Sequence, residues 1–107
     1  MTVTAITSLS QFQEIIAQDR PCIIDFWATW CGPCRIISPI FEKLSAQFGE
    51  NVDFYKVDVD TQSEISEAVG IRAMPTFVAF KGKEKIGEVV GANPPQLENL
   101  IITTASK

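Results

Sequence analysis

The stretch Trp30-Cys31-Gly32-Pro33-Cys34 decides how the rest of the chain is interpreted. It follows an apolar run over residues 22–28, which is typical of a buried strand, and precedes an amphipathic run over residues 35–48, which predicts a helix. Two cysteines with this spacing, at the junction of a strand and a helix, are typical of a redox-active pair. The residues alone therefore favour a thiol–disulfide oxidoreductase.

The composition is that of a globular protein, with 107 residues, 46% apolar and 21% charged. We expect a single domain over residues 1–107, long enough to bury a sizeable core. The net charge of −4 argues against a nucleic-acid binder. The chain contains no histidine, which excludes Cys–His and Ser–His catalysis and every zinc site with a histidine ligand.

The cysteine count also bears on the compartment. Cys22, Cys31 and Cys34 are too few, and odd in number, for a disulfide framework. The first residues lack the pattern of a secretory signal, and no run approaches the ~18 apolar residues of a membrane span. We expect a soluble cytoplasmic protein, and a processed form from an organelle remains an alternative.

The periodicity predicts the order β-α-β-α-β-α-β-β-α, an α/β fold with helices on both faces of one mixed sheet. Capping signals support the helices, since Ser8 with Gln11 and Thr61 with Glu64 each form a capping-box pattern. Asn93, followed by Pro94 and Gln96, marks another helix start. Gly49 and Gly70 are the expected stops, and Pro39 should kink the long helix. We expect strands over residues 2–6, 22–28, 52–59, 76–80 and 85–90, and helices over 8–18, 35–48, 61–70 and from 93 onward.

The cysteine segment has the features that thiol–disulfide exchange requires. If Cys31 is the N-cap of the helix, the free N–H groups and the helix dipole stabilise its thiolate and lower its pKa. Cys34 follows one turn later and faces inward, so Cys31 would attack and Cys34 would resolve the mixed disulfide. Gly32 would let a substrate backbone approach, and Pro33 suits a first-turn position because it lacks an N–H. Arg35 adds a nearby cation.

A zinc knuckle is an alternative use of two such cysteines. It needs two further ligands, and the chain offers only Cys22 and no histidine. Iron–sulfur ligation fails for the same reason unless two chains share a cluster. We interpret Cys22 as a small buried hydrophobe at the start of a strand, with a regulatory thiol as the alternative.

Asp25 is unusual because it lies within an otherwise apolar strand. Burial should raise the pKa of its carboxyl group. One hypothesis is that Asp25 exchanges a proton with Cys34, directly or through water, during resolution. The alternative is a structural carboxylate bonded to a backbone group or to Lys56 on a neighbouring strand. Replacing Asp25 should slow resolution, most visibly at lower pH.

Neighbouring residues have both structural and functional interpretations. Trp27 is interpreted as mostly core, whereas Trp30 adjoins Cys31 at a turn and should be partly exposed. Met74 could be a filler, and Gly91 could be no more than a bulge glycine.

At this point the residues resemble a known family. Asp25-Phe26-Trp27-Ala28 followed by Trp30-Cys31-Gly32-Pro33-Cys34 is similar to the active-site signature of the thioredoxin family. The segments Lys56-Val57-Asp58-Val59-Asp60, Gly70-Ile71-Arg72-Ala73-Met74-Pro75-Thr76 and Gly91-Ala92 match in order and spacing. The resemblance covers essentially the whole chain.

The resemblance implies a five-stranded mixed sheet flanked by four helices, with Pro75 opposite the cysteines after a cis peptide bond. The Met74 backbone would pair with the substrate chain as an added strand. Asp25 and Lys56 match the family's buried acid and its partner lysine. The framework around Cys31 would comprise Trp30, Gly32, Pro33 and Pro75, and the docking surface would add Met74, Gly91 and Ala92.

The resemblance also implies an activity and partners. The family reduces protein disulfides with electrons from NADPH, received through thioredoxin reductase, and needs no metal or tightly held organic cofactor. Targets would be disulfide-containing proteins such as peroxiredoxin- or reductase-type enzymes, with no nucleic acid or membrane partner, and the protein would be a monomer. Arg35, Ala73 and Met74 depart from the commoner residues and leave substrate preference open.

Two other functions remain as alternatives. An interaction module could use the same apolar surface without redox chemistry, although the presence of both cysteines argues against it. A disulfide isomerase or oxidase is disfavoured by the Gly32-Pro33 dipeptide and by the absence of a secretory signal.

Overall fold

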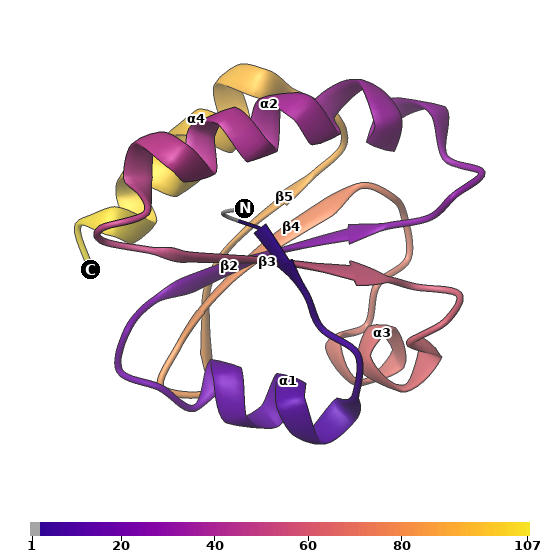
Figure 1. Cartoon of the computed structure of the whole chain (residues 1–107), viewed down its shortest axis with the longest axis horizontal. Helices are drawn as coiled ribbons and strands as arrows, with labels where there is room; N and C mark the ends of the chain where they lie inside the picture. Colours follow the sequence, from indigo (N-terminus) through magenta and orange to yellow (C-terminus); the bar gives the residue numbers. More distant parts are fainter. Residues whose placement is uncertain (1–2) are drawn as a thin grey trace.

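A five-stranded sheet forms the middle layer of the protein in the computed structural model, which describes residues 3–107 (Figure 1). Its strand order is β1-β3-β2-β4-β5. The bounds are β1 Val3–Ala5, β2 Cys22–Trp27, β3 Asp53–Asp58, β4 Thr76–Lys81 and β5 Glu84–Val90. The strands β1, β3 and β2 are parallel, whereas β4 runs antiparallel to β2 and β5 antiparallel to β4. The mixed sheet expected from the sequence is confirmed.

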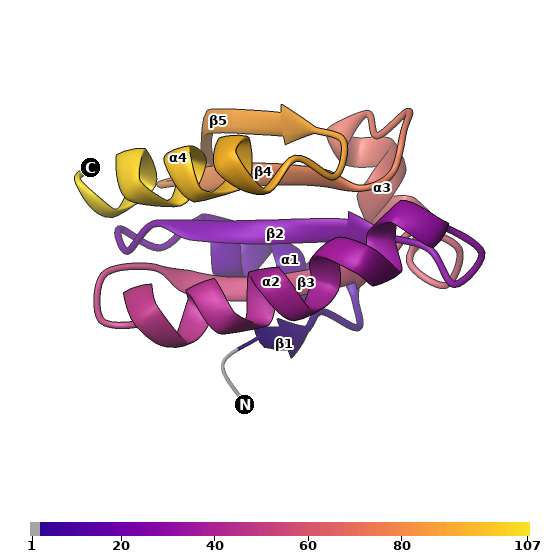
Figure 2. The same cartoon turned by 90° about the horizontal axis from the view of Figure 1, so that it is seen from above.

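Helices cover both faces of this sheet. The helices are α1 Leu9–Ile16, α2 Gly32–Phe48, α3 Ser63–Val69 and α4 Pro94–Ala105. Figure 1 shows α2 and α4 on one face and α1 and α3 on the other. Seen from above, α2 and α4 run alongside one another over the central strands (Figure 2). The predicted order of elements is confirmed within the described residues.

Alternation along the central strands supplies a core to each face. In β2, Ile23 belongs to the core beneath α2 and α4, whereas Ile24 and Phe26 belong to the core above α1 and α3. All three are fully buried, as expected for a strand covered on both sides. Asp25, like Ile23, therefore points to the face covered by α2, where the cysteines lie.

Local signals explain most helix starts. The Gln11 N–H donates to Ser8 Oγ at 3.1 Å, and the Gln96 N–H donates to Asn93 Oδ1 at 3.1 Å, so both predicted caps are confirmed. The return bond of the first capping box differs, because Gln11 Oε1 accepts from the Thr7 N–H at 2.8 Å.

The predicted cap at Thr61 is wrong. The N-cap of α3 is Gln62, and its side chain makes no capping bond. The chain turns here through a bond from the Gln62 N–H to the Asp58 carbonyl at 2.9 Å, and the Thr61 hydroxyl donates back to that same carbonyl. The helix therefore starts one residue later than the capping-box pattern predicted.

Element bounds differ from the predicted ones by a few residues. Thr2, at the start of the first predicted strand, lies outside the described residues. The helix expected from residue 35 begins at Gly32 and continues through Pro39. Gly70 ends α3 with φ of 82°, a left-handed conformation that favours glycine. Among residues 3–107, the helices are too short or too polar to cross a lipid bilayer.

Candidate active site

The junction of β2 and α2 places the cysteine pair. Cys31 is the N-cap of α2, with extended backbone angles, and its Sγ accepts a hydrogen bond from the Cys34 N–H at 3.2 Å. Pro33 lies in the first turn, where a missing N–H costs nothing. The predicted N-cap position of Cys31 is thus confirmed. A sulfur at this position faces the positive end of the helix dipole, which favours a thiolate.

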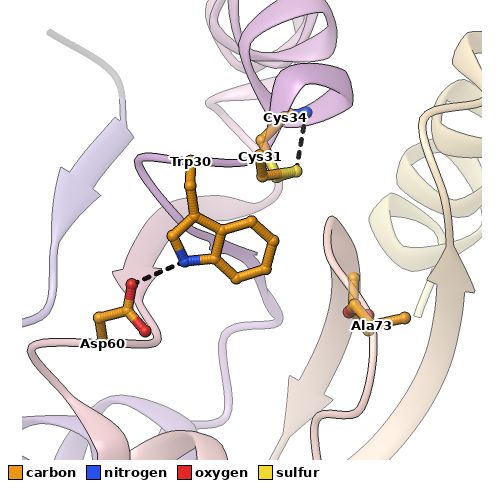
Figure 3. Close-up of a disulfide and its surroundings, with 6 residues drawn as sticks. Trp30, Cys31, Cys34, Asp60 and Ala73 are labelled. Carbon is orange, nitrogen blue, oxygen red and sulfur yellow. Dashed lines mark hydrogen bonds between the residues drawn. A yellow bond between two sulfur atoms is a disulfide. The ribbon is translucent and has the colours of Figure 1, made fainter.

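The two cysteines form a disulfide. The Cα atoms of Cys31 and Cys34 are 5.3 Å apart, and Figure 3 shows the pair at the start of α2. In this oxidised state Cys31 is 4% exposed and Cys34 is 3% exposed, so burial does not distinguish them. The two differ in their surroundings, because Cys34, and not Cys31, lines a half-open cavity beside the start of α2.

That cavity connects Cys34 to Asp25. It has a volume of about 130 Å³ and is lined by Asp25, Trp27, Cys34, Arg35, Ser38 and Lys56. Asp25 is only 4% exposed. Burial raises the pKa of its carboxyl group to about 7, against a smaller lowering by the positive charge of Lys56. Asp25 can therefore gain or lose a proton near neutral pH.

Asp25 and Lys56 are neighbours in the sheet, but they do not pair directly. They are register partners in the parallel pair of β2 and β3. The described part of the chain contains no ion pair between them, and Asp25 Oδ1 has no hydrogen-bond partner. The indole N–H of Trp27, which lines the same cavity, is also without a partner. The direct Asp25–Lys56 bond of the structural alternative is therefore not observed.

A second loop lies beside the disulfide. The Met74–Pro75 peptide bond is cis, as the resemblance implied. Met74 packs against the cluster formed by the two cysteines and Ala28. The Gly91 N–H donates to the Pro75 carbonyl at 2.8 Å, which joins the loop after β5 to the cis-proline loop.

These contacts bring most of the predicted docking residues together. Gly91 has φ of 103°, a left-handed conformation that glycine adopts most easily. Pro75 itself is buried, whereas Ala92 is exposed next to Gly91.

Two residues in this region were not singled out from the sequence. The Thr76 hydroxyl donates to the Ala73 carbonyl at 2.5 Å and so closes the loop that carries Met74 and Pro75. Asp60 Oδ2 accepts a hydrogen bond from the indole N–H of Trp30 at 3.0 Å (Figure 3). The only sequence signal for Asp60 was its place in the segment from Lys56 to Asp60, which matched the family.

Cys22 is separate from this site. It is buried and free, and burial raises the pKa of its thiol to about 12, so it stays protonated at neutral pH. Among residues 3–107, no group of three or more His, Cys, Asp or Glu side chains is placed to hold a metal ion.

Comparisons with known proteins agree with this geometry. The thioredoxin family model matches residues 3–103. Thioredoxin from Malassezia sympodialis is 56% identical over 100 residues, which cover 92% of this chain and 95% of that protein. Thioredoxin from Coprinus comatus is 57% identical over 100 residues, covering 92% and 94% of the two chains.

Solved structures give the same result. The crystal structure of the Malassezia sympodialis thioredoxin superposes with a TM-score of 0.94 at 54% identity, covering 96% of this chain and 90% of that one. A structure from a study of thiol resolution in the yeast mitochondrial 1-Cys peroxiredoxin has a TM-score of 0.89 at 40% identity, with 95% of each chain covered. The family match, the mixed sheet and the Cys31–Cys34 disulfide at the start of α2 all agree, and the chain belongs to the thioredoxin family of thiol–disulfide oxidoreductases.

Proposed function

We propose that this protein reduces disulfide bonds in a range of target proteins. The observation that carries the proposal is the Cys31–Cys34 disulfide at the N-terminus of α2, with Cys34 facing the cavity that holds Asp25. A dithiol at this position has a nucleophile at the positive end of a helix and a second thiol that shares a cavity with a buried acid.

The reaction takes two exchange steps. The Cys31 thiolate attacks one sulfur of the target disulfide, forms a mixed disulfide and releases the other target sulfur as a thiolate. Cys34 then loses its proton and attacks the Cys31 sulfur. The intramolecular disulfide forms, and the second target sulfur leaves and takes up a proton. Two electrons pass to the target, and the protein ends in the oxidised state of this structure.

Asp25 is the proposed proton acceptor in the second step. Its carboxyl group and Cys34 line one cavity, and its pKa of about 7 allows it to take a proton at neutral pH. Asp25 Oδ1 and the Trp27 N–H are both unpaired and buried, one an acceptor and one a donor. A cavity of about 130 Å³ is roomy enough for water, and these two unpaired groups could both bind it, which favours a water-mediated transfer. Lys56 would stabilise the ionised carboxylate from across the cavity.

The target would dock on the surface around Cys31. Trp30 is 63% exposed there, and Gly32, Pro33 and Ala92 are also exposed. The backbone at Met74 would bond to an extended target segment, which gives affinity without demanding a particular side chain. Such contacts suit a reductase that acts on many proteins.

The proposal extends to the electron donor and the compartment. We assign re-reduction of the disulfide to thioredoxin reductase and place the protein in the cytoplasm, with peroxiredoxin- or reductase-type enzymes among its targets. The family membership supports the reductase and the targets, and one structural neighbour comes from work on a peroxiredoxin. NADPH oxidation by a thioredoxin reductase that depends on this protein would test the donor.

The direct test of the activity is reduction of insulin disulfides with dithiothreitol as the electron source. The wild type should accelerate precipitation of the insulin B chain, and Cys31→Ser should abolish the acceleration. When the reduced protein is mixed with insulin without dithiothreitol, Cys34→Ser should instead accumulate a mixed disulfide between Cys31 and the target, visible by non-reducing electrophoresis. Cys22→Ala is the matched control and should keep full activity, because Cys22 is buried away from the site. An inactive wild type would favour an interaction module instead.

A further inference from the structure

Trp30 is an exposed aromatic side chain with one anchoring contact. The residue is 63% exposed, yet its indole N–H donates to Asp60 Oδ2 at 3.0 Å, across 30 residues of sequence. An exposed side chain usually samples several rotamers, because little packing restrains it. A hydrogen bond to a carboxylate is stronger than one between neutral groups, so this bond favours one orientation of the ring.

Asp60 is itself held in place by the end of a central strand. Its N–H donates to Asp58 Oδ1 at 2.9 Å. The Asp58 carbonyl accepts from the Gln62 N–H at 2.9 Å, which closes the turn on its other side. Asp58 is the last residue of β3 and pairs in register with Trp27 at the end of β2. Asp60 is thus anchored to the ends of two central strands of the sheet.

The hydrogen bond to Asp60 sets which way the apolar part of the indole points. In Figure 3 the indole nitrogen points to Asp60, and the six-membered ring points away from it, toward the side where Cys31 and Ala73 lie. A target chain that reaches Cys31 between Trp30 and the Ala73 loop would meet the ring in this orientation.

We propose that Asp60 is a positioning residue that fixes the Trp30 ring as a preformed wall of the target-docking surface. The inference rests on the proposed docking role of Trp30 and adds the device that orients it. A preformed wall lowers the entropy lost when a target binds, so its loss should weaken docking and leave the exchange chemistry intact.

The kinetic test compares a protein disulfide with a small one. Asp60→Ala should raise KM for insulin about three- to ten-fold and change kcat less than about two-fold, because only docking is affected. Its rate with 2-hydroxyethyl disulfide, which is too small to use the wall, should stay unchanged. Asp60→Asn keeps an acceptor oxygen and should retain a KM near that of the wild type.

Two further variants separate the possible causes. Glu64→Ala removes one negative charge from the first turn of the neighbouring helix α3 and should leave KM unchanged. Trp30→Ala tests the docking role itself and should raise KM at least as much as Asp60→Ala does.

A spectroscopic readout tests the orientation directly. The chain has two tryptophans, so Trp30 is the only one left in a Trp27→Phe background. In that background, adding Asp60→Ala should lower the fluorescence anisotropy of Trp30, while adding Asp60→Asn should not.

The outcomes distinguish the inference from its premise. An unchanged KM in Trp30→Ala would remove the docking role on which the inference rests. A raised KM in Trp30→Ala with an unchanged KM and anisotropy in Asp60→Ala would overturn the positioning role alone. Equal effects of Glu64→Ala and Asp60→Ala, or equal losses on insulin and on the small disulfide, would also overturn it.

Discussion

Among single residues, Asp25 matters twice, because its burial suits it to act as a base for Cys34 and also makes the stability of the protein depend on pH. An ordinary thiol, with a pKa of about 8.5, is mostly protonated at pH 7, so attack by a buried cysteine gains from a nearby base. Asp25 faces the same cavity as Cys34, and its pKa of about 7 lets a fraction of the carboxyl groups act as that base at neutral pH.

We therefore expect Asp25→Asn to slow resolution of the mixed disulfide about 10- to 100-fold near pH 7. The difference should shrink above about pH 9, where hydroxide removes the thiol proton without help. Stopped-flow measurement of target release from about pH 6 to about pH 10 would show it. Ser38→Ala is the control, since Ser38 lines the same cavity but carries no ionisable group. Equal rates for Asp25→Asn and wild type at every pH would exclude Asp25 as the base.

The same carboxyl group should make stability depend on pH. Its pKa rises from 3.8 in a model peptide to about 7 in the folded protein, so between these values the folded state holds a proton that the unfolded state has released. The free energy of unfolding contributed by Asp25 therefore falls as pH rises through that window and levels off above pH 7.

Asp25→Asn has no carboxyl group to ionise, so it should not show this fall in the free energy of unfolding as pH rises. With the disulfide intact, the variant should be more stable than wild type at pH 8, by at most about 4 kcal/mol, and the gain should be small at pH 4. Urea denaturation at both pH values would measure it. A gain of equal size at pH 4 and pH 8 would show that the charge of Asp25 is not the cause.

At the scale of secondary-structure elements, Arg20 ties the end of α2 to the start of the sheet. Its guanidinium donates to the Gly49 carbonyl at 2.7 Å and the Glu50 carbonyl at 2.9 Å, just after the last residue of α2. It also pairs with Asp53 Oδ1 at 2.8 Å, at the first residue of β3. One planar fork thus satisfies carbonyl groups after the helix and fixes where the next strand begins.

Loss of this fork should cost more than a single surface ion pair. Arg20→Ala should lower the free energy of unfolding by about 1–2 kcal/mol, since bonds to two carbonyls and one carboxylate are lost at a partly exposed site. Arg20→Lys should recover less than half, because an ammonium group cannot reach all three acceptors in the same geometry. Urea denaturation measures the free energy of unfolding of both variants, with Lys43→Ala on the exposed surface of α2 as the control. If Arg20→Lys were as stable as wild type, the positive charge alone, and not the guanidinium geometry, would account for the contact.

How far the sequence predicts an element depends on how local its signals are. The caps at Ser8 and Asn93 were predictable because donor and acceptor lie within three residues of each other. The position of Cys31 at the start of α2 followed from the change of pattern around it. The cap at Thr61 failed although the motif was present, and the turn before α3 is closed instead by bonds from the Gln62 N–H and the Thr61 hydroxyl to the Asp58 carbonyl.

The rest of the candidate site could not be predicted, because its contacts join distant segments. The bond from Trp30 to Asp60 spans 30 residues, and the bond from Gly91 to Pro75 joins two loops. The lack of a direct bond between Asp25 and Lys56 depends on side-chain orientations inside a cavity. These contacts leave no local pattern in the sequence, so they become visible only once the fold brings the segments together.

At the scale of the whole molecule, the two cores share their strands. The core beneath α2 and α4 and the core above α1 and α3 take alternate residues from β2, β3 and β4. In β4, for example, Phe77 and Ala79 face one core while Val78 and Phe80 face the other. Opening either core would expose one face of the strands that support the other. We therefore propose that the described chain unfolds as one cooperative unit.

A substitution far from the active site tests this cooperativity. Phe12 in α1 packs edge-to-face on Phe80, with ring centroids 5.8 Å apart, on the face opposite α2. Phe12→Ala should cost about 3–5 kcal/mol, as expected for a buried phenylalanine. It should lower the urea midpoint equally in far-UV circular dichroism, which reports all elements, and in tryptophan fluorescence, which reports Trp27 and Trp30. Gln13→Ala, on the exposed side of the same helix, should shift neither midpoint. If the fluorescence midpoint of Phe12→Ala stayed at the wild-type value while the dichroism midpoint fell, the α1 and α3 layer would unfold separately from the site that holds the cysteines.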